Sequence, residues 1–220
     1  MSFVSHVSRL KHVARLTSVS MALAWCSLMP ARAHAQGSSE LPVDARAKGS
    51  KQAPVTVYEM ADFQCPFCRD FALQTMPTLD KEYIKTGKVR WIFINLPIPS
   101  IHHNAVAAAE FAACAARQGK FWQAHDMLYG THDKWENLKS VGPYLQSQIP
   151  LLGLKADAMT TCLQTGVGSA TVRDDVAGAE RSGARSTPTF YIEGGLMEGA
   201  QPIEVFRRVL DSVYAAKTKK

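Results

Sequence analysis

Residues 62–68 of this 220-residue chain read DFQCPFC, and this short stretch decides how the fold is interpreted. Cys65 and Cys68 stand three positions apart, with Pro66 and Phe67 between them. A Cys-x-x-Cys pair can be half of a zinc site, a structural disulfide or a redox couple. The sequence on either side of the pair distinguishes these three uses.

The flanking residues predict a β-α-β unit around the pair. Residues 55–60 (VTVYEM) have the β-branched content of a strand. Residues 69–87 show helical spacing, with Pro77 expected to break or kink the helix and Gly87 to end it. Residues 89–97 (VRWIFINLP) form the continuous apolar run of a central strand. A Cys-x-x-Cys beside such a unit is typical of a thioredoxin-like redox motif.

The helix start gives the pair its chemistry. Unpaired backbone N–H groups and the positive end of the helix dipole lie beside the first cysteine, and both favour a thiolate. Pro66 suits the first helical turn, where its missing N–H costs nothing. We therefore expect Cys65 to face solvent as the nucleophile and Cys68 to lie one turn inside as its resolving partner.

The two other uses of the pair fit the sequence less well. A structural zinc site takes four Cys or His ligands, usually as two close pairs, but Cys114 and Cys162 each stand alone. His102 and His103 are adjacent, so they point in different directions on most backbones. A purely structural Cys-x-x-Cys disulfide closes a very small loop and adds little chain entropy. We expect a redox couple and no metal site.

The first 35 residues have the layout of a secretory signal peptide. A basic leader precedes an apolar run at residues 16–29, and the small-x-small sequences ARA and AHA follow. An uncleaved amphipathic anchor is the alternative. Four of the 25 Lys and Arg residues lie in this leader with none of the 19 Asp and Glu, so cleavage lowers the net charge from +6 to +2. No basic stripe with interleaved aromatics remains, and no nucleic-acid partner is expected.

The remaining chain predicts an α/β fold with an all-helical inserted subdomain. Residues 36–53 are polar and resemble a linker or a loosely held arm. Residues 100–183 are Ala-rich or of helical spacing throughout. A third strand (187–195), a short fourth strand (196–200) and a closing helix after Pro202 follow. We expect residues 54–99 and 184–220 to form one thioredoxin-like domain around the helical insertion at 100–183.

Three segments together resemble the DsbA-type thiol–disulfide oxidoreductases, whose thioredoxin fold carries a helical insertion. The segments are residues 59–68 (EMADFQCPFC), residues 102–129 (HHNAVAAAEFAACAARQGKFWQAHDMLY) and residues 186–195 (STPTFYIEGG). The resemblance extends from about Ala53 to the last helix. It implies that Cys65 attacks and becomes linked to substrate, and that Cys68 releases the mixed disulfide.

The resemblance also implies roles for residues outside the pair. Pro188 would be a cis-proline facing the cysteines, with Thr187 offering backbone hydrogen bonds to a bound peptide. Taken alone, Pro188 is an ordinary trans proline at a strand start. Glu59 would be a buried acid that exchanges a proton with Cys68, and its alternative is a surface Glu on an alternating strand.

The spacer residues Pro66 and Phe67 should tune the couple and contact a bound peptide. Stabilising the thiolate of Cys65 stabilises the reduced protein and makes its disulfide a stronger oxidant. The best-known DsbA spacer has His where this chain has Phe67. Phe67 offers the thiolate no charge and no donor, so we expect a milder oxidant.

Cys114 and Cys162 both fall within the expected insertion. A disulfide between them would join two helices and is worth about 4 kcal/mol in the chain-entropy model. Two separate buried thiols are the alternative, because cysteine is often buried.

These inferences predict an exported, periplasmic thiol:disulfide oxidoreductase that gives its disulfide to reduced, unfolded secreted proteins or peptides. It would need no cofactor, act as a monomer and be reoxidised by a membrane partner of the DsbB type. One alternative is a disulfide isomerase or reductase kept reduced by a membrane partner. Another is a peptide-binding holdase without redox turnover.

Overall fold

Two parallel strands form the centre of the sheet. β2 (Val55–Ala61) and β3 (Val89–Asn95) pair in parallel over their whole length, with Glu59 opposite Phe93. Both strands follow the apolar, β-branched runs that predicted them. The structure, a computed structural model, describes residues 41–219. The expected signal peptide (1–35) lies outside the described residues, as do residues 36–40 of the expected linker.

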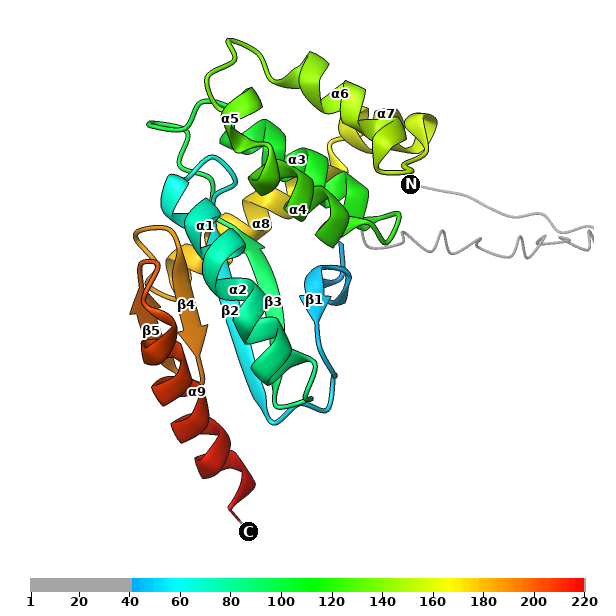
Figure 1. The fold of residues 1–220 in the computed structure, drawn as a ribbon. Helices are drawn as coiled ribbons and strands as arrows, with labels where there is room; N and C mark the ends of the chain where they lie inside the picture. Colours follow the sequence, from blue (N-terminus) through cyan, green and yellow to red (C-terminus); the bar gives the residue numbers. More distant parts are fainter. Residues whose placement is uncertain (1–40, 220) are drawn as a thin grey trace, which may run out of the picture. The chain divides into compact units, whose positions relative to one another are not determined.

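Three antiparallel strands complete the sheet in the order β1-β3-β2-β4-β5 (Figure 1). β4 (Thr189–Ile192) pairs with β2, and β5 (Gly195–Glu198) pairs with β4 and forms the edge of the sheet. On the opposite edge, β1 (Ala47–Lys48) pairs with β3. β1 lies within the segment that the sequence indicated as a linker or arm. A buried ion pair fixes this segment, since Arg46 lies inside the fold against Asp175.

One long helical run begins directly after Cys65 and covers the front face of the sheet (Figure 1). Pro77 was expected to break or kink this helix, but the chain stays helical from Pro66 to Ile84. The run accommodates the proline with a π-helical segment (Phe71–Thr75) just before it, in which the Met76 N–H bonds to the Phe71 carbonyl. The run consists of α1 (Pro66–Asp70), the π segment, α2 (Met76–Leu79) and a second π segment (Asp80–Ile84). Gly87 ends it with φ +77°.

The C-terminal helix shares the front face. α9 (Ile203–Thr218) begins directly after Pro202 and buries Phe206 and Leu210. These two side chains join a core of aromatic and aliphatic residues that includes Phe71, Trp91 and Phe190. No helix among residues 41–219 is both long and apolar enough to cross a membrane.

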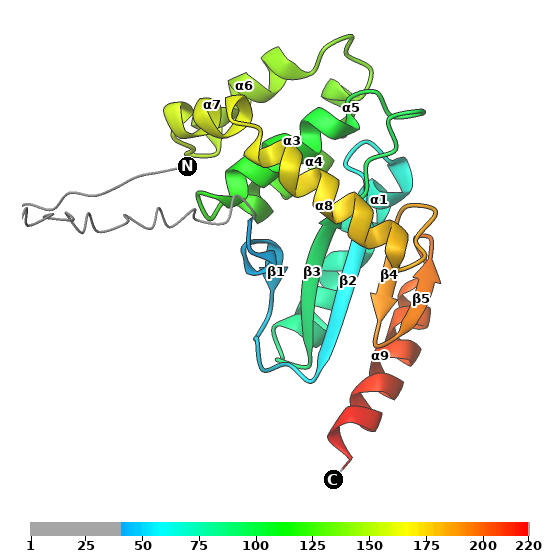
Figure 2. The same cartoon turned by 180° about the vertical axis from the view of Figure 1, so that it is seen from behind.

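Six helices separate β3 from β4 and form the insertion that the sequence predicted. They are α3 (Ala105–Ala116), α4 (Phe121–Gly130), α5 (His132–Trp135), α6 (Gly142–Leu151), α7 (Ala156–Gln164) and α8 (Val167–Arg181). The last of them, α8, crosses the back face of the sheet (Figure 2). There Ala179 packs with Met60 and Leu96. The α/β thioredoxin-like fold with a helical insertion is thereby confirmed.

Candidate active site

The two cysteines lie at the start of α1, close to the carboxyl end of β2. Cys65 is the N-cap residue and Pro66 occupies the first helical turn. Cys65 is 4% exposed and Cys68 is fully buried. The expectation that Cys65 faces solvent is wrong, because the segment before β4 covers it: its Sγ lies 3.4 Å from the carbonyl oxygen of Thr187. The exposed residues of the motif are the two spacers, Pro66 and Phe67, and Phe67 is 64% exposed.

The two thiols are not bonded to each other, and their pKa values are shifted in opposite directions. A hydrogen bond from Cys68 is the largest cause that lowers the pKa of Cys65, to about 6, against the effect of burial. The side chain of Thr187 and the backbone N–H groups of Cys68 and Phe67 act in the same direction. Burial raises the pKa of Cys68 well above its ordinary value, and the neighbouring Cys65 and Glu59 raise it further. This asymmetry suits Cys65 to be the nucleophile and the leaving group.

The segment before β4 faces the pair. The peptide bond between Thr187 and Pro188 is cis, which is the geometry that the resemblance implied. Pro188 is buried, and its carbonyl accepts a hydrogen bond of 2.7 Å from the Gly199 N–H beyond β5. The structure thus brings Thr187 and the thiol of Cys65 together.

Glu59 is a buried acid on β2 and not a surface residue, at 1% exposed. Its Oε2 accepts a 2.7 Å hydrogen bond from the indole Nε1 of Trp91, and its Oε1 has no partner. Burial raises the pKa of Glu59 to about 7, although the Trp91 bond and the charge of Lys48 oppose this. A carboxyl group with this pKa can give or take a proton near neutral pH.

The sequence interpretation missed the importance of the residues just before Cys65. Asp62 and Gln64 are loop and capping residues by type, but they are buried at 1% and 6% exposed. Both bond to the helical insertion, for example through the 2.8 Å contact between Asp62 Oδ2 and His102 Nδ1. The role of Trp91 as the donor to Glu59 was also missed. The available signal was the presence of an Asp and a Gln in an otherwise apolar motif.

His102 and His132 bond to the loop before Cys65, at Asp62 and at the Gln64 carbonyl. His125 packs edge-on against Trp122, with ring centroids 4.9 Å apart. Within residues 41–219, no three His, Cys, Asp or Glu side chains are grouped as metal ligands.

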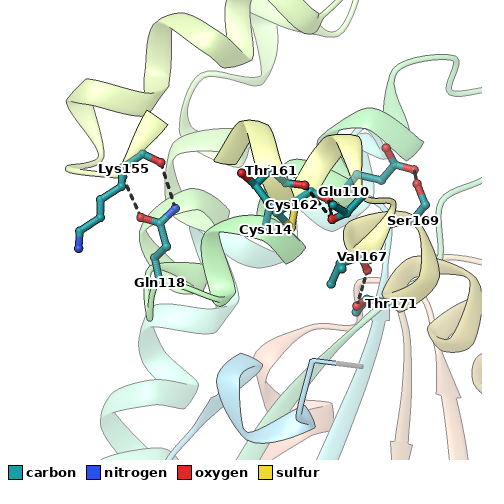
Figure 3. The surroundings of a disulfide bond; sticks show 10 residues. Glu110, Cys114, Gln118, Lys155, Thr161, Cys162, Val167, Ser169 and Thr171 are labelled. Atoms are coloured by element: carbon teal, nitrogen blue, oxygen red, sulfur yellow. Dashed lines mark hydrogen bonds between the residues drawn. A yellow bond between two sulfur atoms is a disulfide. The ribbon is translucent and has the colours of Figure 1, made fainter. Parts of the chain in front are cut away.

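The second pair of cysteines joins two helices of the insertion. Cys114 on α3 and Cys162 on α7 are bonded as a disulfide (Figure 3). Gly168 at the start of α8 packs against it, and a Cβ there would lie 3.1 Å from the Cys114 Sγ. The disulfide and this close approach hold α3, α7 and α8 together.

The family model described as Thioredoxin matches residues 43–212, which is most of the chain. This chain belongs to the thioredoxin family. Proteins named for disulfide bond formation and for DsbA are among those that it resembles. The probable disulfide bond formation protein D of Bacillus anthracis is 30% identical over 64% of this chain and 65% of its own length. The resemblance stated from the sequence is confirmed.

Solved structures share the fold of this DsbA-like chain at lower identity. BdbD from Bacillus subtilis matches with a TM-score of 0.71 at 19% identity, over 80% of this chain and 96% of that one. Wolbachia pipientis alpha-DsbA1 matches with a TM-score of 0.68 at 24% identity, over 78% and 92%.

A different kind of relative is a longer protein that resembles this chain over part of its length. The Na(+)/H(+) antiporter NhaA 3 of Salinispora tropica is 32% identical over 161 residues, which are 73% of this chain and 23% of the antiporter. The chain therefore spans less than a quarter of the length of that relative.

Proposed function

We propose that this protein is an exported thiol:disulfide oxidoreductase that donates a Cys65–Cys68 disulfide to reduced, unfolded secreted proteins or peptides. One observation carries the proposal: hydrogen bonds lower the pKa of Cys65 to about 6 against the effect of burial, whereas burial raises the pKa of Cys68. A pair built in this way has one sulfur that leaves readily and one that holds its proton.

The exchange proceeds in two steps that transfer two electrons. A substrate thiolate attacks the Sγ of Cys65, so that a bond forms between substrate and Cys65 while the Cys65–Cys68 bond breaks. Cys68 leaves with the electron pair and takes a proton. A second substrate thiolate then attacks the substrate sulfur of the mixed disulfide, and Cys65 leaves as a thiolate. The substrate is oxidised to a disulfide and the protein is reduced to a dithiol.

Glu59 supplies the proton that Cys68 takes in the first step. Its pKa of about 7 makes it a proton donor at neutral pH, and its charge influences the pKa of Cys68. Oε1 has no protein partner and is the oxygen free to exchange a proton, directly or through a water molecule.

The direction of electron flow follows from the same pKa. At pH 7, a thiol with a pKa of about 6 stabilises the reduced protein relative to an ordinary cysteine by about one pKa unit. That energy corresponds to about 30 mV for a two-electron couple. This supports a mild oxidant, in line with the expectation from Phe67.

Thr187, Pro188, Pro66 and Phe67 would bind the substrate peptide. Pro66 and Phe67 are exposed between the two cysteines, and the Thr187 carbonyl lies 3.4 Å from the Cys65 sulfur. We further propose that the protein is a monomer in the periplasm and is reoxidised by a membrane partner of the DsbB type. The name of the Bacillus relatives, disulfide bond formation protein D, supports the proposed role in disulfide formation.

Titration of the Cys65–Cys68 couple against glutathione tests the proposal. We expect a potential more oxidising than that of the glutathione pool of a reducing cytosol, together with oxidation of a reduced dithiol peptide. A strongly reducing potential would instead identify a reductase. An inert pair with persistent suppression of aggregation would identify a holdase.

A further inference from the structure

The residue before Cys65 is bound to the helical insertion at both ends of its side chain. Gln64 Nε2 donates a 2.8 Å hydrogen bond to the carbonyl of Glu136, just after α5. Gln64 Oε1 accepts a 2.7 Å hydrogen bond from the N–H of Asn104, the N-cap residue of α3. One side chain thus joins the end of α5 to the start of α3. The N–H of Asn104 has no partner within α3, and Gln64 supplies one.

The backbone of Gln64 is held as firmly as its side chain. His132 Nε2 donates a 2.8 Å hydrogen bond to the Gln64 carbonyl, and the Gln64 N–H donates a 2.7 Å bond to Asp62 Oδ1. All four polar groups of Gln64 therefore have protein partners. The other carboxylate oxygen of Asp62 accepts 2.8 Å bonds from the Ile98 N–H and from His102.

This arrangement bears directly on Cys65, the next residue. Cys65 has an extended backbone (φ −71°, ψ 123°), and this conformation directs its sulfur toward the N–H groups of Phe67 and Cys68. The peptide group that precedes Cys65 carries the Gln64 carbonyl. Fixing that carbonyl limits rotation of the N-cap residue and so holds the sulfur beside its donors.

We propose that Gln64 is a positioning residue that fixes the Cys65 sulfur for thiol–disulfide exchange by locking the active-site loop to the helical insertion. This inference rests on the exchange chemistry proposed above. It gives the insertion a part in the reaction, because Asn104, His132 and Glu136 all belong to it. Gln64 acts through Cys65 and does not itself touch the reacting sulfur of a substrate.

The test compares Gln64→Met with Gln118→Met. Gln118 is a matched control, since its side chain also bonds a backbone N–H and a backbone carbonyl, both of Lys155, within the insertion (Figure 3). Three quantities are measured for each protein: the pH dependence of Cys65 alkylation by iodoacetamide, the exchange equilibrium with glutathione, and the thermal unfolding temperature.

We expect Gln64→Met to move the alkylation midpoint upward by about one pH unit, which lowers the rate at pH 6 about fivefold. The glutathione equilibrium at pH 7 should shift about fivefold toward the protein disulfide. Gln118→Met should leave both unchanged. Either substitution can lower the unfolding temperature, so only the first two quantities distinguish positioning from stability.

A second variant covers the case in which Gln64→Met does not fold. His132→Phe removes the donor to the Gln64 carbonyl and keeps a ring against Trp135, whose centroid lies 5.4 Å from that of His132. We expect a shift in the same direction. Folded variants with an unchanged midpoint and equilibrium would overturn the inference, and so would an equal shift in Gln118→Met. Absence of glutathione exchange in the unsubstituted protein would instead refute the proposed function, while the alkylation midpoints would still test positioning.

Discussion

The indole Nε1 of Trp91 on β3 donates a 2.7 Å hydrogen bond to Oε2 of Glu59 on β2, the strand that leads to the cysteine pair. A neutral donor is thus the direct partner of a fully buried carboxyl group. Because this bond does not compensate for the loss of hydration, burial still raises the pKa of Glu59, to about 7. The relationship links the stability of the fold to its chemistry.

Glu59→Gln should stabilise the protein at alkaline pH and slow the exchange. The folded pKa of Glu59 lies above its ordinary value of 4.5, so the folded state holds a proton that the unfolded state has lost. The contribution of Glu59 to the free energy of unfolding is greatest below pH 4.5. It decreases by about 3 kcal/mol in total as the pH rises from 4.5 to 7. Urea unfolding between pH 4 and 8 measures the slope. A Cys65→Ala, Cys68→Ala background removes the titration of the thiols.

In that background, the parent should lose stability with rising pH and Glu59→Gln should not. An identical slope in the two proteins would show that Glu59 titrates normally. Oxidation of a dithiol peptide by the Glu59→Gln variant, with both cysteines present, should be slower at pH 7 because no proton reaches Cys68.

Lys48→Met should raise the pKa of Glu59 above about 7. The charge of Lys48 favours the ionised carboxylate, and the β1 strand places Lys48 opposite Trp91 in the register with β3. Its ammonium group also lies 4.2 Å from the centroid of the Trp122 ring. The pH at which stability levels off should move upward in the unfolding experiment described above. If this pH stays the same in Lys48→Met, Lys48 does not influence the pKa of Glu59.

Phe67→His should make the couple more oxidising. Phe67 is 64% exposed, so the substitution should change the stability of the fold little. A partly charged ring beside Cys65 would stabilise its thiolate, and each unit by which the pKa falls adds about 30 mV at pH 7. Glutathione titration of the two proteins gives the difference. A more reducing Phe67→His protein would contradict the role assigned to the spacer.

Replacing both cysteines of the insertion by alanine should destabilise the protein by about 4 kcal/mol. The pH dependence of Cys65 alkylation should stay unchanged, because the Cys114–Cys162 disulfide contributes to the stability of the insertion and not to the pair. Denaturant unfolding measures the loss. Alkylation of the oxidised parent followed by mass spectrometry is the control, and two free thiols there would contradict the disulfide.

Local sequence signals were enough to predict the pair and four of the five strands of the sheet, but not β1, which lies in the expected linker or arm. The apolar runs at residues 55–60 and 89–97 became β2 and β3, and the cysteines lie at the start of a helix as their spacing indicated. Pro77 does not break the helix, although a local rule treats proline as a break. The neighbouring π turn, which depends on the packing of the whole helix, accommodates it.

The interactions that could not be predicted join residues far apart in the chain. Gln64 and Glu136 are separated by 72 positions, and Arg46 and Asp175 by 129. A single sequence carries no signal for such pairs, since a buried Gln or Arg looks like a surface residue until its partner is known. The burial of Cys65 under Thr187 belongs to the same class, because β4 returns to the pair only after the whole insertion.

The most direct test measures the alkylation rate of Cys65 in the reduced protein by iodoacetamide between pH 4 and 10, with the modified peptide identified by mass spectrometry. The pKa of about 6 predicts a midpoint near pH 6 and a Cys68 that stays unmodified until far higher pH. A midpoint near 8.5, the value of an ordinary cysteine, would contradict the account, because Cys65 would then have no stabilised thiolate.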